Sequence, residues 1–348
     1  MILQQRLDLL IQLGKYMQSD EPLWLEAKKK AEQANGWFTA EFIDLSCANI
    51  ARSFLQPELL HAFATRYNVL AQTNDPKMVG LVMAGNIPLV GFHDFLCVFL
   101  SGHRMIIKPS SKDTVLIRHL AEQLYNWDKA TRSLILFADI LKGCDAYIAT
   151  GSNNSARYFD YYFQKYPHII RRNRTSVAIL TGEETPEQLD RLSDDVHLYF
   201  GLGCRNVTKL YVPTGYDFVP LLEAFKKYSY FIDHNKYKNN YDYQLAIHLL
   251  NKQYYMTNGS ILLIESSSLF SPISQLNYSF YENAPSLVKE LSTNVDVQCI
   301  TVKEHVVSNT VGQSSGSLAG SLVHFGQVQT PSLTDYADGV DTMAFLKF

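Results

Sequence analysis

Cys204 lies in a setting that suits a nucleophile better than a core side chain. It occurs in the segment GLGCRN, directly after Gly203 and three residues after Gly201. A buried cysteine is expected among large apolar neighbours on a strand or helix, whereas two glycines favour an exposed turn. A nearby helix end, or the positive charge of Arg205, would favour the reactive thiolate. The sequence therefore predicts thiol chemistry at Cys204.

The other four cysteines fit the ordinary role of small buried apolar residues. They are Cys47, Cys97, Cys144 and Cys299. The five cysteines are odd in number and widely spread, with no CxxC pair and no Cys/His spacing suited to zinc. We expect neither a disulfide framework nor a metal site.

Two polar residues follow predicted strands. Asn86 lies in the turn GNIP after the strand VGLVMA, and Lys108 ends the strand RMIIK one apolar helix later. In open α/β sheets ligands bind at the carboxyl edge, where a lysine reaches an adenosine ribose or its phosphate. Taken singly, a turn asparagine and a solvated strand-end lysine are the alternative interpretation.

A third junction, IATGSNNS, joins a strand to a helix through Thr150, Gly151 and Ser152. The start of a helix offers unpaired N–H groups and a positive dipole end to an anion such as pyrophosphate. Turns with Gly and Ser are also common helix caps, and the chain has no GxGxxG fingerprint. Taken alone, this junction favours an ordinary cap.

The elements around these residues predict an α/β fold. The first seventy or so residues show helical periodicity, with Pro22 and Pro57 where a first helical turn tolerates proline. From Lys77 strands alternate with helices, which implies a parallel, doubly wound sheet. Asp113 is a predicted N-cap for the helix TVLIRHLAEQLYNW. Further on, Asn258-Gly259 predicts a hairpin turn.

Four regions follow from this alternation. We expect a helical N-terminal layer over 1–75, a first α/β domain over 76–195, a second α/β domain with the Cys204 loop over 196–325, and a C-terminal segment over 326–348. A Ser- and Gly-rich run over 308–320 is the best candidate for a mobile loop.

Composition excludes several function classes. A formal charge of -3 and a pI near 6.4 give no general attraction to nucleic acid or anionic membranes. No window approaches the roughly 20 apolar residues that cross a bilayer. The start MILQQRLDLLIQLGKY has the pattern of an amphipathic helix rather than a signal peptide. We therefore expect a cytoplasmic protein that binds neither nucleic acid nor membrane.

The segments AGNIPL, IIKPS, ATGS and GLGC, in this order, resemble the aldehyde dehydrogenase superfamily, and most of all its LuxC-like acyl-CoA reductases. The resemblance runs from about Lys77 to the C-terminus. LFSPIS over 269–274 is similar to the family's glutamate-plus-IFGP segment, and HFGQVQTPSLTDYADGVDTMAFL resembles the C-terminal signature of the reductase subgroup.

The resemblance implies a fold and a set of roles. The fold is aldehyde dehydrogenase-like, with a doubly wound parallel-sheet domain that binds a nicotinamide cofactor over 76–195 and an α/β catalytic domain with the nucleophile loop over 196–325. The helical layer over 1–75 is then expected to pack on the cofactor domain. Residues 326–348 are expected to serve oligomerisation or to return to the cofactor domain. The implied roles are catalysis by the nucleophile Cys204 and the oxyanion-hole Asn86, and cofactor binding by Lys108, Ser110, Thr150, Gly151 and Ser152.

Departures from the family pattern set the direction of the chemistry. Aldehyde-oxidising members carry a glutamate that activates water, and the corresponding stretch here, IRRNRTSVAIL, has no carboxylate. A thioester reductase needs no such base because hydride attacks the acyl-enzyme. Ser268 replaces the glutamate that holds the nicotinamide ribose. Ser111 and Lys112 replace the acidic residue that would repel a ribose 2′-phosphate, which favours NADPH over NADH.

The expected function is NAD(P)H-dependent reduction of an acyl-CoA, or another acyl thioester, to the aldehyde through an acyl-cysteine intermediate. One alternative is an acyl-phosphate reductase of the same fold. Another is a degenerate scaffold subunit that accepts acyl groups without reducing them. The resemblance also implies a homo-oligomer and allows a synthetase or transferase partner.

Overall fold

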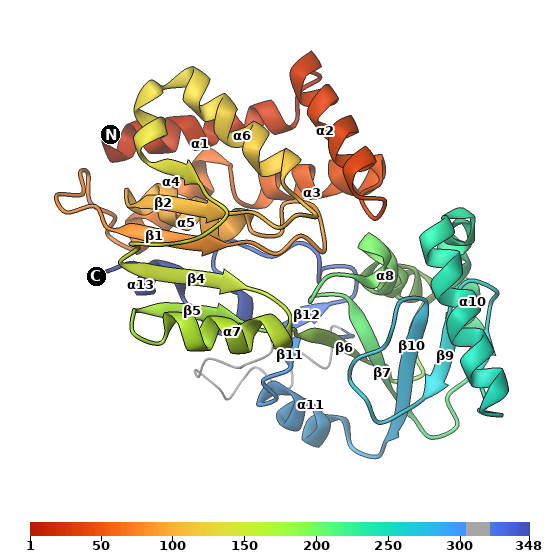
Figure 1. Ribbon diagram of the computed structural model, residues 1–348. Coiled ribbons are helices and arrows are strands. Elements are labelled where there is room, and N and C mark those ends of the chain that lie inside the picture. Colours follow the sequence, from red (N-terminus) through yellow and green to blue (C-terminus); the bar gives the residue numbers. More distant parts are fainter. Residues whose placement is uncertain (304–320) are drawn as a thin grey trace. The chain divides into compact units, whose positions relative to one another are not determined.

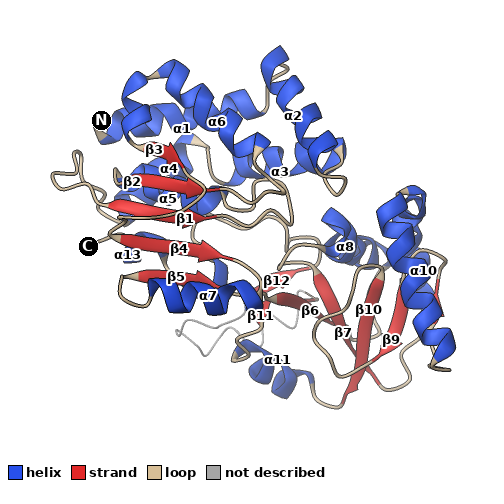
Figure 2. Cartoon of the chain, viewed as in Figure 1, coloured by secondary structure: helices blue, strands red, loops and turns tan. Residues whose placement is uncertain are grey.

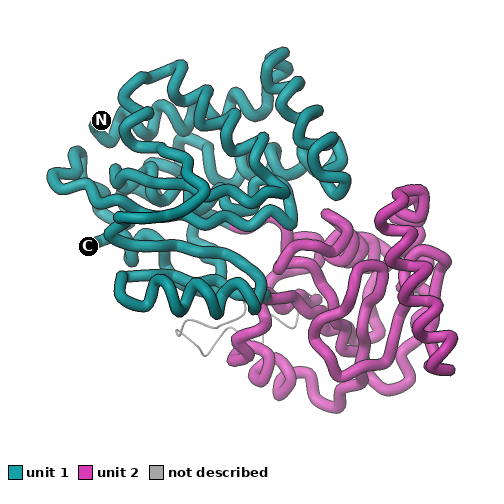
Figure 3. The backbone as a smooth tube through the Cα atoms, in the orientation of Figure 1, with its two compact units in different colours: residues 1–173, 332–348 teal, residues 174–331 magenta. Residues whose placement is uncertain are grey.

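The computed structural model describes residues 1–303 and 321–348, and it divides into two compact units. Unit 1 comprises 1–173 and 332–348, and unit 2 comprises 174–331 (Figure 3). The predicted mobile loop over 308–320 lies outside the described residues. In the described parts of the chain, no helix has the length and apolar character to cross a membrane.

Four helices precede the first strand. Two of them begin with the prolines expected at a first helical turn, Pro22 and Pro57. The hydroxyl of Thr39 caps a third by accepting the N–H of Phe42. These helices are α1 (Leu3–Met17), α2 (Pro22–Ala34), α3 (Ala40–Ser53) and α4 (Pro57–Arg66) (Figure 1).

Unit 1 contains a five-stranded parallel sheet with the strand order β3-β2-β1-β4-β5. The strands are β1 (Met78–Val82), β2 (Arg104–Lys108), β3 (Ile135–Phe137), β4 (Ala146–Thr150) and β5 (His168–Arg171) (Figure 2). From β1 the chain proceeds outward to β2 and β3, and then crosses back to β4 and β5. The order therefore reverses between β1 and β4, and such a reversal marks the ligand crevice of open α/β sheets.

The helices that connect these strands are α5 (Phe92–Ser101), α6 (Val115–Trp127) and α7 (Asn153–Phe163), with a short 3-10 helix η1 (Lys129–Ser133) before β3. The predicted cap of α6 is wrong, because its N-cap residue is Thr114 rather than Asp113. The carboxylate of Asp113 instead accepts the backbone N–H of Leu89 at 2.7 Å. Leu89 lies in the turn after β1, and its positive φ makes that turn tight.

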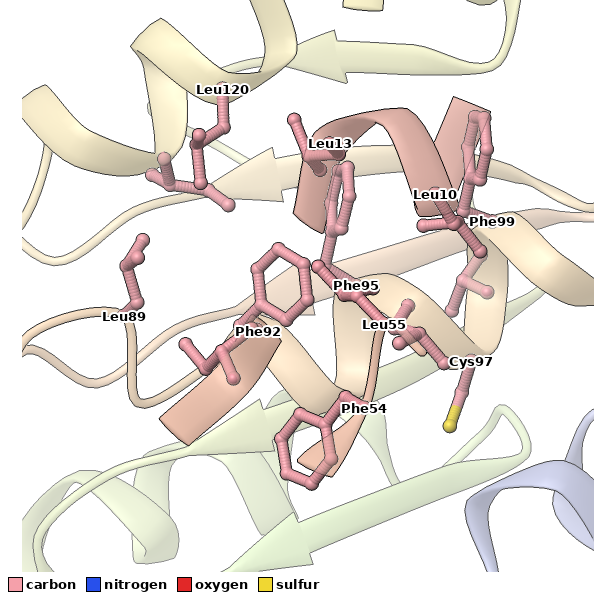
Figure 4. Close-up of a cluster of buried hydrophobic side chains, with 14 of the residues drawn as sticks. Leu10, Leu13, Phe54, Leu55, Leu89, Phe92, Phe95, Cys97, Phe99 and Leu120 are labelled. Atoms are coloured by element: carbon pink, nitrogen blue, oxygen red, sulfur yellow. The ribbon is translucent and has the colours of Figure 1, made fainter. Parts of the chain in front are cut away.

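The core of unit 1 forms around α5, which is apolar on nearly every side. Phe92, Phe95 and Phe99 of this helix are each at most 1% exposed. They lie among leucines of α1 and α6, including Leu10 and Leu120 (Figure 4). Burial of such side chains contributes about 1.5 to 3 kcal/mol each. The N-terminal helices are therefore part of this core rather than an appendage.

The last 17 residues, 332–348, belong to unit 1. They contain a 3-10 helix η5 (Ala337–Gly339) and α13 (Thr342–Phe345). The guanidinium of Arg171 donates to the carbonyl of Ala337 at 2.6 Å and to the hydroxyl of Thr342 at 2.9 Å, and forms a buried ion pair with Asp94 of α5. Most of the segment 326–348, for which oligomerisation or a return to the cofactor domain is predicted, thus belongs to unit 1.

Unit 2 contains a seven-stranded sheet with the order β12-β11-β6-β7-β10-β9-β8. Every neighbouring pair is parallel except β8 and β9, which form the hairpin predicted from Asn258-Gly259. The strands are β6 (Thr175–Ile179), β7 (Val207–Pro213), β8 (Met256–Thr257), β9 (Leu262–Glu265), β10 (Gln275–Tyr281), β11 (Val297–Val302) and β12 (Ser321–His324).

The helices of unit 2 cover this sheet and connect its strands. They are α8 (Pro186–His197), η2 (Leu198–Gly201), α9 (Val219–Ala224), η3 (Phe225–Asp233), α10 (Asn235–Leu250) and α11 (Ala284–Ser292). A capping box at Thr185 and Gln188 starts α8, the helix that leads into the segment around Cys204.

The division between the units lies at Arg174, about twenty residues before the boundary predicted at 196. The difference arises from β6, which falls within the range 76–195 predicted for the cofactor domain. All five residues of β6 are buried, and the strand pairs with β11 on one side and β7 on the other. A strand buried in this way requires neighbours on both sides, and the neighbours of β6 belong to unit 2.

Candidate active site

Cys204 is the one partly exposed cysteine of the five, while Cys47, Cys97, Cys144 and Cys299 are buried. The contrast predicted from the sequence is therefore confirmed. Cys204 lies in a turn between η2 and β7. Cys204 therefore lies on a loop just before a strand, and it is partly exposed.

The backbone before Cys204 is strained. Tyr199 and Phe200 each have a φ of 56°, and Gly201 follows with a φ of 74°. A non-glycine residue held in this left-handed region costs about 1 to 3 kcal/mol. Both aromatic rings are only 4% exposed, and Phe200 packs on Phe231 with ring centroids 4.5 Å apart. Tertiary packing therefore holds the turn in a conformation that the local sequence would not choose.

Asn206 holds the turn in place through hydrogen bonds of its side chain. Its side chain is fully buried, accepts the N–H of Gly203 at 2.8 Å and donates to the carbonyl of Leu198 at 2.8 Å. These two bonds join the residue before Cys204 to the end of α8. Its amide also donates to the carbonyls of Asp195 and Val196 in α8, so a buried polar group links the turn to this helix.

Ser176 of β6 also holds the turn in place through hydrogen bonds. Its hydroxyl donates to the carbonyl of Cys204 at 3.2 Å and accepts the N–H of Cys299 at 3.1 Å. A guanidinium nitrogen of Arg205 lies 3.2 Å from the sulfur of Cys299. Arg205, whose charge is expected to favour the Cys204 thiolate, donates to the sulfur of Cys299. Strand β6 and strand β11 therefore both support the Cys204 turn.

Strand β7 also connects the Cys204 turn to the loop before β10, which contains Ser268. The loop's carbonyls are held by three buried or half-buried side chains. Thr208 donates to Leu269 at 2.6 Å, Asn277 donates to Phe270 at 3.0 Å, and Lys209 donates to Ser266. Burial lowers the pKa of Lys209 to about 8. The hydroxyl of Ser268 is occupied locally, since it donates to the carbonyl of Phe270.

The predicted cofactor-binding residues lie at one edge of the sheet in unit 1. Lys108 ends β2 and is paired in register with Val82, which ends β1. Val82 is paired in turn with Ala149, one residue before Thr150 at the end of β4. Asn86 follows β1 by four residues. The three segments therefore meet at the carboxyl edge, on both sides of the point where the strand order reverses.

Close backbone approaches shape this edge. A Cβ added to Gly85 would lie 2.7 Å from the Cβ of Ser110, so the turn before Asn86 packs directly on the segment after Lys108. The carboxylate of Asp113 holds the same turn through Leu89, and burial raises the pKa of Asp113 to about 7.

The helix α7 begins at this edge as well. The hydroxyl of Ser152 caps it by accepting the N–H of Ser155 at 3.3 Å. A Cβ added to Gly151 would lie 2.9 Å from side-chain atoms of Ser155 and Phe159, so only glycine fits. The turn is thus a true helix cap, as its composition suggested, and it also presents the start of an 11-residue helix at the ligand edge.

Unit 1 therefore brings together Asn86, Lys108, Ser110 and the turn 150–152, while Cys204 belongs to unit 2. The joint action of Asn86 and Cys204 on one substrate stays a prediction. Sequence reasoning missed the supporting residues Asn206 and Ser176. A polar residue within the apolar run TSVAIL was the available signal for Ser176, whereas Asn206 had only its place in a turn.

The family model described as Acyl-CoA reductase (LuxC) matches residues 47–220, half of the chain, and this range contains every predicted site residue. A sequence search of curated proteins found no match.

Solved structures share the fold at low sequence identity. Aldehyde dehydrogenase 21 from Physcomitrella patens, solved with the product succinate, is 12% identical, with a TM-score of 0.71 over 97% of this chain and 79% of that one. An NADP-dependent enzyme of E. coli is 12% identical, with a TM-score of 0.69 over 92% and 78%.

An aldehyde dehydrogenase of Mycobacterium tuberculosis, complexed with NAD+, is 12% identical, with a TM-score of 0.68 over 92% of this chain and 77% of that one. The topology of both sheets, the residues at their edges and the family match lead to one assignment. The chain belongs to the LuxC acyl-CoA reductase family and has the fold of the aldehyde dehydrogenase superfamily.

Proposed function

We propose that this protein reduces an acyl-CoA thioester to the aldehyde with NADPH, through an acyl group carried on Cys204. The family match and the fold support an oxidoreductase of aldehyde-related chemistry. One observation supports acyl transfer through Cys204 in particular. Cys204 is partly exposed on a strained turn that buried polar side chains hold in place, whereas the other four cysteines are buried.

In the first step the Cys204 thiolate attacks the thioester carbonyl, a carbon–sulfur bond forms, and the CoA thiolate leaves with its electron pair. The negative charge on the carbonyl oxygen is assigned to the side-chain amide of Asn86 and the backbone N–H of Cys204. One such donor contributes about 3 to 4 kcal/mol in related sites. The braces at Asn206 and Ser176 keep the turn, and with it the N–H, in a fixed orientation.

The carboxyl edge of unit 1 fits a dinucleotide. Lys108 is exposed at a strand end, the capped start of α7 lies beside it, and Gly85 and Gly151 let the backbone approach closely. Fold neighbours include an NADP-dependent enzyme and an NAD+ complex. When bound, a reduced nicotinamide supplies the hydride that turns the acyl-cysteine into a thiohemiacetal, which then releases the aldehyde.

Replacing Cys204 with Ala tests the nucleophile. NADPH oxidation measured against a series of acyl-CoA chain lengths is expected to fall by about 10³-fold or more, while NADPH binding, followed by its fluorescence, is retained. Cys144→Ala is the matched control and is expected to keep its turnover. Undiminished turnover in the Cys204 variant would refute the assignment.

Ser111 is proposed to favour NADPH because it leaves room for a 2′-phosphate without a repelling charge. It is exposed three residues beyond β2, and the adjacent Lys112 is exposed too. Ser111→Glu is expected to weaken the binding of NADPH by about 10-fold and the binding of NADH much less. Ser111→Gln controls for size. The comparison uses Kd values for both nucleotides, and an equal loss for the two would contradict the preference.

A further inference from the structure

Unit 1 contains a cavity of about 310 Å³ at the edge of the sheet opposite to Lys108. Arg104, which begins β2, lies in its wall, and Lys108 ends the same strand. At about 3.3 Å per residue the two ends of the strand are roughly 13 Å apart. The residues that line the cavity include Arg6, Thr73, Pro76, Gly102, Arg104 and Ser133.

Arg6 of α1 supplies a buried charge to this cavity. The residue is 1% exposed, and its two terminal nitrogens donate to the carbonyls of Met1 and Leu70 at 3.3 and 3.1 Å. Its Nε is buried without a hydrogen-bond partner, and no carboxylate of the described residues pairs with it. Burial lowers the pKa of Arg6 to about 10, so the guanidinium stays charged at neutral pH. Buried cations are normally paired.

The guanidinium is held in place by the end of α5. Gly102 ends this helix with a φ of +82° and packs directly on Arg6, since a Cβ there would lie 2.1 Å from Nη1. The same Cβ would lie 2.5 Å from the hydroxyl of Thr73. The charge is therefore fixed against the backbone of a lining residue rather than carried on a mobile surface chain.

Arg104 adds a second guanidinium that remains accessible. Its side chain is exposed, and its hydrogen bond, to the carbonyl of Pro76 at 3.2 Å, uses one Nη. No Asp or Glu is among the residues that line the cavity. Asp75 lies near Arg104 but outside the cavity wall, where it pairs with Lys77. Two guanidinium groups in a wall that has no carboxylate favour an anion, and their planar donor arrangement suits phosphoryl oxygens. A volume near 300 Å³ is at the lower end of small-molecule sites.

We propose that this cavity is a second ligand site, which binds a small phosphorylated anion between Arg6 and Arg104. It is distinct from the carboxyl edge proposed for the nucleotide, because it lies at the other end of the same strands. The anion would compensate the buried charge of Arg6 that the protein itself leaves unpaired.

Calorimetric titration with pyrophosphate at constant ionic strength tests the proposal on the full chain. Four proteins are compared, namely the wild type, Arg104→Gln, Arg52→Gln and Lys108→Gln. Arg52 is an exposed arginine of α3 outside the cavity, so its variant controls for general charge. Lys108→Gln identifies any binding at the nucleotide edge.

We expect the wild type to bind pyrophosphate saturably. Arg104→Gln should weaken the affinity by about 10-fold. The affinities of Arg52→Gln and Lys108→Gln should stay within two-fold of the wild-type value. Absence of saturable binding would overturn the proposal, as would equal weakening in the two arginine variants. Binding that is lost in Lys108→Gln but kept in Arg104→Gln would also overturn it, by placing the anion at the nucleotide edge. The readout does not depend on turnover, so the proposed reductase function stands or falls separately.

Discussion

Buried polar side chains, rather than apolar contacts alone, fix the turn that carries Cys204. Asn206 and Ser176 are both completely buried. Asn206 bonds to Gly203, the residue before Cys204, and Ser176 bonds to the carbonyl of Cys204. A buried amide with its bonds satisfied gives a turn one geometry. We attribute the tolerance of left-handed Tyr199 and Phe200 to these bonds together with the aromatic packing.

Asn206→Ala is expected to destabilise the protein by about 1 to 3 kcal/mol, because it leaves the Gly203 N–H and the Leu198 carbonyl unpaired in the interior. The rate of acylation at Cys204 should fall while nucleotide affinity stays unchanged. Chemical denaturation and single-turnover acylation measure the two effects. Asn239→Ala, at an exposed position of α10, is the control, and the account fails if both variants acylate at the wild-type rate.

Asp113 gives a pH-dependent prediction. Burial raises the pKa of its carboxyl to about 7 in the folded protein, against about 3.9 in an unfolded chain. The folded state therefore binds the proton of Asp113 more tightly than the unfolded chain does. The contribution of this proton to the free energy of unfolding is complete below about pH 4 and is lost as the pH rises through 7. Asp113→Asn cannot ionise. Its free energy of unfolding, relative to that of the wild type, should therefore rise by up to about 4 kcal/mol between pH 4 and pH 8.

Thermal unfolding across this pH range measures the difference between the two proteins. Asp139→Asn, at an exposed position, is the control and should follow the wild type at every pH. A constant difference between Asp113→Asn and the wild type from pH 4 to pH 8 would show that the native carboxyl does not titrate in this window.

At the scale of elements, a buried cation is one of the groups that hold the C-terminal segment to the rest of unit 1. Arg171 ends β5, and its ion pair with Asp94 links that strand to α5, while its remaining donors bind Ala337 and Thr342. Removing one partner of a buried pair leaves an uncompensated charge. The stability of unit 1 should therefore depend on this residue far more than on its exposed neighbour.

Arg171→Met is expected to lower the free energy of unfolding by about 3 to 5 kcal/mol. Arg172→Met removes an exposed pair with Asp160 and should cost at most about 1 kcal/mol. Urea denaturation of the two variants gives the comparison. Similar small losses in both would mean that the buried pair does not secure the C-terminal segment.

Element types were predictable from the sequence where the local pattern is strong. The apolar helix α5, the strands β1, β2 and β4 and the hairpin of β8 and β9 all follow from periodicity and turn residues. The short strands β3 and β5 were not identified, and β6 was given to the wrong sheet. A strand's neighbours are decided by tertiary pairing, which a buried run such as TSVAIL does not specify.

At the scale of the whole molecule, the candidate site was predictable in outline but not in its support. Glycine turns and strand ends identified Cys204, Lys108 and Thr150, because these positions need special backbone or an exposed edge. The roles of Asn206 and Asp113 depend on partners several residues or an entire helix away. Such contacts arise from folding and leave little trace in local spacing.

Nearly all of this chain can be superimposed on solved aldehyde-dehydrogenase-like structures. The chains of those proteins are longer, and about four-fifths of their length is covered. The family model shows the family and these structures show the fold. The direction of the proposed reaction depends on whether hydride or water attacks the proposed acyl-cysteine. With no carboxylate in the stretch IRRNRTSVAIL, the account predicts hydride transfer rather than hydrolysis.

The most direct test is mass spectrometry of the Cys204 peptide after the protein is incubated with an acyl-CoA, first without nucleotide and then with NADPH. We predict that Cys204 gains the acyl mass and holds it until NADPH is added, when the group leaves as the aldehyde. An unmodified Cys204, or an acyl group released as the carboxylate at the same rate without NADPH, would contradict the account.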